Sequence, residues 1–303
     1  MALASWLLAR RAGGRTVLRM EDLDTPRVRA GSAERILEAL AWLGLDWDEG
    51  PREGGPHAPY TQSERLALYA EAIAELERLG LLYACDCSRK EIQARTREAN
   101  DASEASDARE ASAPHGAEAV YPGTCRDKAS TRAFKREPAL RLRVPASSHV
   151  SFEDGVQGPH EADVTREVGD FVLRRADGLF AYQLAVVVDD WRMEITDVVR
   201  GADLVPSTAR QLLLGDLLGA PRRRYWHVPM VVLESGERLE KRAFPRSVLQ
   251  LREAGDRAES IVGVLAEGLG VASDASPTTA SRLAAASAWR PRRDAWRVPP
   301  ALR

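Results

Sequence analysis

The chain has 303 residues, of which 44% are hydrophobic and 29% charged, a balance typical of a soluble globular protein with a real core. Its formal net charge of −2 excludes a globally basic nucleic-acid-binding protein, so any contact with nucleic acid must come from a local patch. No stretch approaches the roughly 20 apolar residues of a membrane span, and three cysteines argue against a disulfide framework. We therefore expect a cytoplasmic protein without a membrane partner.

The first part of the chain alternates helical and strand-like segments. The spacing of apolar residues predicts helices over 2–12, 31–43 and about 63–79. TVLRM, at 16–20, is a strand candidate, and carboxylates follow it at once, beginning with Glu21. This alternation predicts an α/β layered fold with a largely parallel sheet.

Residues 93–119 differ in composition from the rest of the chain. They are mostly Ala, Ser, Glu, Asp and Arg, with no apolar period. Such a segment cannot bury enough apolar surface to form a core. We predict a charged, mobile insertion or a frayed helix, placed between two cysteine-bearing segments.

The later part of the chain is predicted to form strands and then helices. ALRLRV, from 139, and DFVLRRADGLFAYQLAVVVDD are strand-like, and Asp177-Gly178 between two apolar runs predicts a hairpin. Residues 207–219 and several short segments beyond about 246 have helical spacing.

All three cysteines lie in two short motifs, Cys85-x-Cys87 and Tyr121-x-x-x-Cys125. A zinc site needs about four ligands in a tetrahedron, drawn from thiolate, imidazole or oxygen donors. The cysteines supply three, and the fourth candidate is the phenolic oxygen of Tyr121 or the more conventional His115. Two cysteines so close together, flanked by charged side chains, favour zinc over buried, reduced thiols.

Two further segments suit charged ligands, although each is weak evidence on its own. GERLEKRAF, at 236–244, places Lys241 beside Arg238 and Arg242, which suits a polyphosphate, but a solvated, charged hairpin is the favoured interpretation of this segment alone. RMEDLDTPR, at 19–27, holds three carboxylates between two arginines. These carboxylates can bind an ammonium group or a metal, or simply lie on a loop.

The order of these segments resembles that in glutamyl-tRNA synthetases and, more closely, in glutamyl-queuosine tRNA(Asp) synthetases. The resemblance covers most of the chain and includes ALASWLLAR, RMEDLDTPR, YTQSERLALY, YACDCSRKEI, YPGTCRD, DFVLRRADGLFAYQLAVVVDD, DVVRGADL and WRVPPAL. It implies a class I, Rossmann-type catalytic domain that activates L-glutamate with ATP, together with Mg²⁺. The glutamate is then esterified onto the queuosine base of tRNA(Asp). We expect the protein to be a monomer.

The resemblance also implies which residues bind the substrates. Glu21, Tyr182 and Arg200 fall where the family binds glutamate; a carboxylate can meet the substrate amine, and Arg200 can bind a carboxylate bidentately. Lys241 matches the catalytic, ATP-binding lysine of the second signature loop, and Arg238 lies beside it in the ATP site.

For the metal, the family's zinc ligands fall on Cys85, Cys87, Tyr121 and Cys125, which favours Tyr121 over His115. The implied domains are the first part of the catalytic domain, a zinc-binding insertion, the second part of the catalytic domain with a KMSKS-like loop, and a C-terminal helical region. Their boundaries are 1–82, 83–138, 139–245 and 246–303.

Two departures from the family pattern predict impaired activity. Family members carry a first nucleotide-binding signature, resembling S-P-T-G-x-L-H-x-G, ahead of the segment that here is ALASWLLAR near the start of the chain. The second signature usually reads K-L-S-K but here has Glu240 in place of the serine, an anion that would repel triphosphate. A non-catalytic paralogue that binds tRNA or glutamate is therefore the alternative. A truncated glutamyl-tRNA synthetase is less favoured, since only about 60 residues follow this loop.

A tRNA contact would need a local cluster of cations. The candidates are Arg222, Arg223 and Arg224, and in the tail Arg290, Arg292, Arg293 and Arg297. A solvated basic face is an equally good interpretation of the tail.

Overall fold

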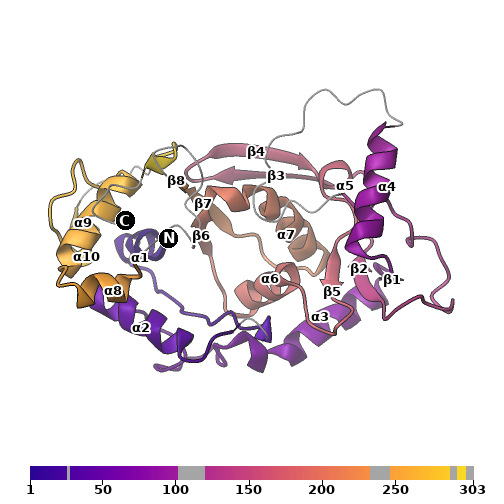
Figure 1. Ribbon diagram of the computed structural model, residues 1–303, viewed down its shortest axis with the longest axis horizontal. Coiled ribbons are helices and arrows are strands. Elements are labelled where there is room, and N and C mark those ends of the chain that lie inside the picture. The colour runs from indigo at the N-terminus through magenta and orange to yellow at the C-terminus, as the bar shows by residue number, and fades with distance from the viewer. Residues whose placement is uncertain (26–27, 102–119, 233–245, 287–291, 298–303) are drawn as a thin grey trace.

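The computed structural model describes the chain except for residues 26–27, 102–119, 233–245, 287–291 and 298–303 (Figure 1). Its helices are α1 (Ala2–Arg11), α2 (Ser32–Trp42), α3 (Leu66–Arg78), α4 (Arg89–Asp101), α5 (Val164–Glu167), α6 (Tyr182–Arg192), α7 (Val205–Leu217), α8 (Val248–Glu253), α9 (Ala258–Leu269) and α10 (Ala280–Ala285). Its strands are β1 (Leu82–Cys85), β2 (Ala139–Leu142), β3 (His149–Asp154), β4 (Gly158–Asp163), β5 (Val172–Arg174), β6 (Asp197–Gly201), β7 (Arg224–Val228), β8 (Val231–Val232) and β9 (Trp296–Arg297). No helix in these described ranges is long and apolar enough to cross a membrane.

The predicted helices are confirmed. The expected segments 2–12, 31–43 and 207–219 correspond to α1, α2 and α7, and the short helices expected beyond 246 are α8, α9 and α10. The segment around 63–79 divides into a short 3-10 turn, Gln62–Glu64, and α3. Apolar spacing located these helices because each contributes apolar side chains to a hydrophobic cluster.

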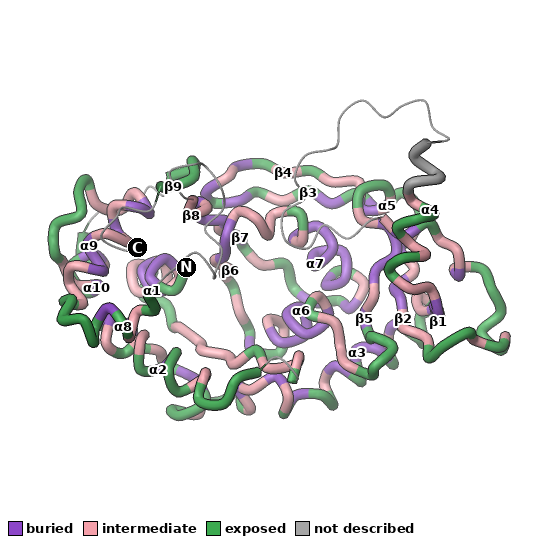
Figure 2. The backbone as a smooth tube through the Cα atoms, viewed as in Figure 1, coloured by how far each residue is buried: buried purple, intermediate pink, exposed green. Residues whose placement is uncertain are grey.

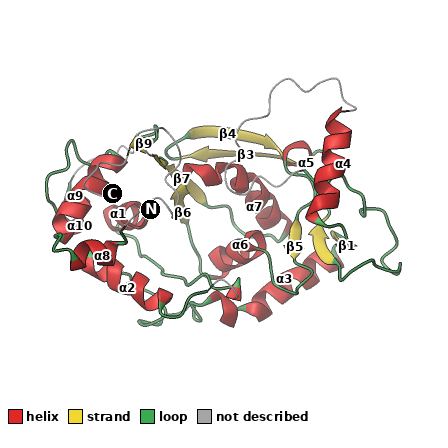
Figure 3. Ribbon diagram, in the orientation of Figure 1, coloured by secondary structure: helices red, strands yellow, loops and turns green. Residues whose placement is uncertain are grey.

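The strands form a more antiparallel arrangement than expected. One sheet has the order β1-β2-β5 and is antiparallel throughout, and a second has the order β4-β3-β7-β6 (Figure 3). In the second sheet β3 pairs antiparallel with β4, while β7 runs parallel to both β3 and β6. The prediction of a largely parallel sheet therefore holds only in part for the described residues. The strands β3, β7 and β6 run parallel, as do β8 and β9, whereas β4 and the first sheet are antiparallel. The connection between β3 and β4 is too short for a crossover, and this forces the antiparallel pairing.

Two segments predicted as strands differ in the structure. Residues 16–20 form only isolated parallel bridges, which join Val17 to Glu49 and Met20 to Thr61. The Asp177-Gly178 turn does follow β5, but the second apolar run is α6 rather than a strand. Every residue of α6 from Leu184 to Asp189 is buried, so its sequence lacks a polar face and resembles a buried strand.

Hydrophobic side chains gather in two large clusters and one small one. The largest joins α3, α6 and α7 to the strands, and the second joins α1 to the C-terminal helices α8, α9 and α10. Figure 2 shows buried backbone running through α6, α7 and α1, with exposed residues on the outer turns of α2 and the loops. The small cluster surrounds the cysteines. Of the predicted insertion 93–119, the first residues form the end of α4 and the remainder lies outside the described residues.

Candidate functional site

Arg200 lies in the sheet with its guanidinium enclosed by neutral hydrogen-bond acceptors. It is 6% exposed and stands on β6, in register with His227 on β7. Its Nε donates to Nε2 of His227 at 3.0 Å, its Nη1 to Oε1 of Gln211 at 2.6 Å, and its Nη2 to Oγ1 of Thr208 at 2.6 Å. Both Gln211 and Thr208 are on α7, so a strand pair and one helix orient this cation.

The charge of Arg200 is not neutralised by an ion pair with any residue that the structure describes. Burial lowers the pKa of its guanidinium below the ordinary value. A buried cation without an anionic partner is costly, and an incoming carboxylate would relieve that cost. Three of the five N–H groups of an arginine side chain are used by the three acceptors, which leaves two for a ligand and for the neighbouring Tyr182.

His227 connects Arg200 to a buried carboxylate. The imidazole is fully buried, and its Nδ1 lies 2.6 Å from Oδ2 of Asp154. Because Nε2 accepts from Arg200, the proton is assigned to Nδ1, which donates to Asp154. Burial and the charge of Arg200 lower the pKa of His227, so the ring is neutral at neutral pH. Asp154 itself has its pKa lowered to about 2, since hydrogen bonds from His227 and the backbone outweigh its burial.

Tyr182 and Glu21 lie at the exposed side of the same region. Tyr182 opens α6 and keeps 42% exposure, and the side chain of Glu21 is 44% exposed. The pKa of the Tyr182 hydroxyl is raised, first by the loss of water around its covered part and then by the negative charge of Glu21, while Arg200 acts in the opposite direction. Glu21, Tyr182 and Arg200 therefore share one electrostatic environment, with the cation buried and the carboxylate in contact with water.

Arg19 fixes the position of Glu21 relative to α6. Its Nη2 donates to Oε1 of Glu21 at 3.2 Å and its Nη1 to Oδ1 of Asp190 at 2.8 Å, and its Nε lies 3.5 Å from Oδ2 of Asp189. Burial acts to lower the pKa of Arg19, but these carboxylates outweigh it and raise the pKa. Asp189 is fully buried and also accepts a hydrogen bond from Nε of Arg65 at 2.6 Å.

Sequence reasoning missed most of the residues that support Arg200 and Glu21. The roles of Asp154, His227, Thr208 and Gln211 were not expected, and Arg19 was noted only as the start of a charged loop. His227 is the one that a pattern could have revealed, because it is a polar residue between the apolar Trp226 and Val228 of β7. The others become neighbours only because α7 packs on the sheet and β3 pairs with β7.

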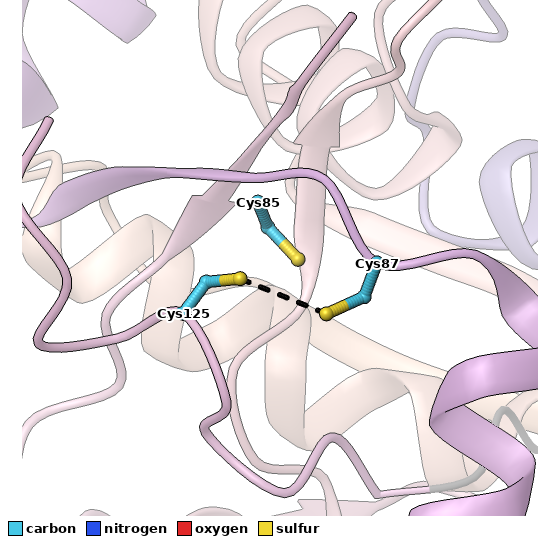
Figure 4. Close-up of side chains that lie close together, drawn as sticks. All are labelled: Cys85, Cys87 and Cys125. Atoms are coloured by element: carbon cyan, nitrogen blue, oxygen red, sulfur yellow. Dashed lines mark hydrogen bonds between the residues drawn. The ribbon is translucent and has the colours of Figure 1, made fainter. Parts of the chain in front are cut away.

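The three cysteines lie together (Figure 4), and Tyr121 belongs to the same small cluster. Their sulfur atoms are all within 4.8 Å of one another, and those of Cys87 and Cys125 are 3.6 Å apart. The hydroxyl oxygen of Tyr121 is 3.3 Å from the sulfur of Cys85 and 3.6 Å from that of Cys87, and it accepts a hydrogen bond from the backbone N–H of Cys125 at 2.8 Å. Cys85 ends β1, whereas Tyr121 and Cys125 lie in the loop that precedes β2.

This donor set fits a tetrahedral zinc ion. Zinc–sulfur bonds of about 2.3 Å in a tetrahedron place two sulfurs about 3.8 Å apart, close to the separation of Cys87 and Cys125. Burial, together with the neighbouring thiols, raises the pKa of Cys87 to about 11. Burial acts in the same direction on Cys85, but hydrogen bonds with Tyr121, the backbone of Cys87 and Arg141 outweigh it and lower that pKa.

Two arginines face this cluster. The guanidinium of Arg141 lies 4.0 Å from the ring centre of Tyr121, and Nη2 of Arg132 lies 3.3 Å from the sulfur of Cys125. Arg132 also donates to Asp86 at 2.7 Å. Positive charges at these positions stabilise thiolates, the form in which cysteine binds a metal.

Several other predicted residues cannot be placed in the site. Arg238, Glu240 and Lys241 of the second signature loop lie outside the described residues, as do His115 and Arg290.

Three of the six candidate tRNA-binding cations that the structure describes are paired with carboxylates. Arg222 pairs with Asp216 and Arg224 with Asp197, each at 2.7 Å. In the tail, Arg292 lies 3.6 Å from Glu267, and Arg293 and Arg297 are exposed.

Comparison with known proteins gives consistent matches. A family model described as tRNA synthetases class I (E and Q), catalytic domain, matches residues 1–284. The Glutamyl-Q tRNA(Asp) synthetase of Nitratidesulfovibrio vulgaris is 46% identical over 282 residues, covering 91% of this chain and 82% of that protein. The protein of the same name from Symbiobacterium thermophilum is 43% identical over 290 residues, covering 93% and 84%. The crystal structure of glutamate-tRNA synthetase from Elizabethkingia anophelis superposes with a TM-score of 0.80 at 25% identity; it covers 99% of this chain, which spans 64% of that one.

Proposed function

The chain belongs to the class I tRNA synthetases (E and Q), and on this premise we propose that it activates glutamate with ATP and transfers it to the queuosine base of tRNA(Asp). Two relatives that carry the name Glutamyl-Q tRNA(Asp) synthetase, each more than 40% identical over most of both chains, support this activity over others in the family. In this proposal the protein is a ligase that acts as a monomer in the cytoplasm, where its tRNA substrate is found.

The observation that carries the proposal is the buried, unneutralised charge of Arg200 beside an exposed carboxylate. Glutamate offers two carboxylates and one ammonium group. Arg200 binds one carboxylate through its remaining N–H groups, and Glu21 attracts the ammonium group. Tyr182, whose hydroxyl is influenced by both charges, supplies a hydroxyl to the bound amino acid.

Activation joins glutamate to ATP at the α-phosphate. A carboxylate oxygen of glutamate attacks the α-phosphorus, the bond to the β-phosphate oxygen breaks, and pyrophosphate leaves with the electron pair. A hydroxyl of queuosine then attacks the activated carbonyl carbon, gives up its proton, and displaces AMP. Lys241, as the catalytic cation, and Arg238 hold the ATP phosphates with Mg²⁺, because cations at this position stabilise the charge that develops on phosphate oxygens.

We further propose that Cys85, Cys87, Tyr121 and Cys125 hold one structural zinc ion. The metal would join the end of β1 to the loop that precedes β2, two segments separated by the long insertion in sequence. A bound zinc ion would neutralise the thiolates and link the two segments through its ligand bonds. Its binding would contribute directly to the folding free energy.

Two assays on the purified, zinc-loaded chain test the proposed function. Glutamate-dependent exchange of labelled pyrophosphate into ATP measures activation, with aspartate and glutamine as controls. Labelled glutamate is then offered with tRNA(Asp) that contains queuosine, tRNA(Asp) that lacks it, and tRNA(Glu). Transfer only to the queuosine-containing tRNA is the expected result. Transfer to tRNA(Glu) instead would make the chain a glutamyl-tRNA ligase, and binding of glutamate without exchange would make it a non-catalytic binder.

A further inference from the structure

The guanidinium of Arg200 is oriented by a chain of buried groups that ends on a carboxylate. Asp154 lies at the end of β3 and His227 on β7, and neither side chain has appreciable exposure. The hydrogen bonds run from Arg200 Nε to His227 Nε2 at 3.0 Å, and from His227 Nδ1 to Asp154 Oδ2 at 2.6 Å. The imidazole of His227 therefore separates the carboxylate of Asp154 from the guanidinium of Arg200, and the two charged groups are not in direct contact.

This separation has a chemical consequence for ligand binding. A carboxylate in direct contact with Arg200 would neutralise it and compete with an anionic ligand for its N–H groups. A neutral imidazole can accept from Nε without cancelling the charge. The imidazole must then keep its proton on Nδ1, and only an acceptor at the position of Asp154 Oδ2 ensures this.

We propose that His227 and Asp154 are positioning residues for Arg200: by fixing the imidazole tautomer, Asp154 keeps the guanidinium oriented and its charge available for the substrate carboxylate. This inference rests on the proposed function, because it takes Arg200 to be the group that binds glutamate. Neither residue touches the substrate, so both act through Arg200 and are expected to affect glutamate rather than ATP.

The substitution Asp154→Asn separates this role from packing. Oδ1 of Asp154 accepts from the backbone N–H groups of Val156 and Gln157 at 2.9 and 2.8 Å, and the amide oxygen of an asparagine can keep both bonds. Its NH₂ group would then replace Oδ2 and point a donor at Nδ1 of His227. The imidazole proton would move to Nε2, where it faces the N–H of Arg200, and the orienting hydrogen bond would be lost.

Two further variants and one control complete the design. His227→Leu removes both hydrogen bonds, whereas His227→Gln places an amide oxygen within reach of Arg200 and should restore part of the function. Trp226→Phe is the matched control: Trp226 is the preceding residue of β7, its side chain points to the other face of the sheet, and it too donates to a carboxylate, that of Asp197 at 3.0 Å.

The test combines pyrophosphate exchange on the full, zinc-loaded chain with NMR of ¹⁵N-labelled histidine. Asp154→Asn and His227→Leu should raise the KM for glutamate about 10- to 100-fold, as loss of an outer-shell partner commonly does, with the KM for ATP within about twofold of the parent. His227→Gln should recover much of the loss, and Trp226→Phe should change neither KM. In the spectra, Nδ1 of His227 should carry the proton in the parent chain and Nε2 in the Asp154→Asn variant.

The outcomes separate this inference from the proposed function. If the parent chain shows glutamate-dependent exchange but Asp154→Asn leaves the KM for glutamate unchanged, the positioning role is wrong and the function stands. The same holds if the tautomer changes without an effect on KM. If the parent chain shows neither exchange nor glutamate binding, the proposed function fails, and the inference fails with it.

Discussion

The sulfur atoms of Cys87 and Cys125 lie 3.6 Å apart, although 38 positions separate the two residues in the chain. We predict one tightly bound zinc ion per chain and its loss in Cys125→Ser, with a melting temperature lower by roughly 5–10 °C, because structural zinc contributes to folding. Elemental analysis and thermal unfolding measure both effects. His115→Ala should retain its zinc. A native chain without zinc, whose three thiols all react freely, would refute the site.

Replacing Arg200 by lysine should impair glutamate binding although the charge is kept. An ammonium group lacks the planar fork that contacts three acceptors and still binds a carboxylate. Hydrogen bonds to charged groups are worth about 1.5–3 kcal/mol, so we expect the KM for glutamate in the exchange assay to rise about 10- to 100-fold. The control is Arg192→Lys, at the exposed end of α6. Equal effects from both substitutions would show that Arg200 is not special.

The lowered pKa of Asp154 predicts that the folded protein loses stability in acid. Its pKa is about 2 in the folded protein, below the ordinary 3.8, so its ionised form stabilises the fold above pH 3.8 and this stabilisation is lost as the pH falls towards 2. The free energy of unfolding of the parent chain, relative to Asp154→Asn, should therefore drop by about 2 kcal/mol across this window. Urea unfolding at steps from pH 5 to pH 2.5 measures the difference. A pH-independent difference would contradict the assigned shift.

The acidic residue in the second signature loop predicts that ATP use can be improved. Glu240→Ser removes a negative charge beside Lys241 in the proposed ATP site. A like charge a few ångströms away costs about 1–2 kcal/mol in a solvated site, so kcat/KM for ATP should rise about tenfold. Glu237→Ser removes the same charge from the same loop and serves as the control. If the two variants behave alike, the effect is general and Glu240 does not face the phosphates.

The cations at 222–224 predict local, salt-sensitive contact with tRNA. Reversing all three arginines to glutamate should weaken binding of queuosine-containing tRNA(Asp) and flatten its dependence on salt, because fewer counterions are released. Filter binding from 50 to 200 mM salt measures both, and circular dichroism checks the fold, since Arg222 and Arg224 pair with carboxylates. Arg78→Glu, on α3, is the control. Unchanged affinity in the triple variant would exclude this surface.

Much of the architecture could be predicted from local patterns. The helices can be located because their apolar residues recur at helical spacing. The two cysteine motifs also lie together, as expected if they share one set of metal ligands. α6 was mistaken for a strand because burial on all sides removes the polar face on which periodicity depends. The sheet directions depend on which strands become neighbours, and β3 and β7 meet from distant parts of the chain.

The support of Arg200 could not be predicted for a related reason. Arg200, His227 and Asp154 come from three strands, and no local pattern connects them. The resemblance to known synthetases pointed to Arg200 through its motif, but the acceptors around it are neutral residues with no distinctive spacing. Their role depends on distances that arise only when α7 and β3 pack against β6 and β7.

Helix α6 carries Tyr182 at its first residue and Asp190 near its last turn, and Asp190 holds Arg19, which in turn holds Glu21. Helix α6 thus connects Tyr182 and Glu21, two groups of the proposed site that are far apart in sequence. In the proposed site these contacts position Glu21 relative to Tyr182 before an amino acid arrives. In the proposed site we therefore expect aspartate, one methylene shorter than glutamate, to bind less well, because Arg19 links the carboxylate of Glu21 to α6.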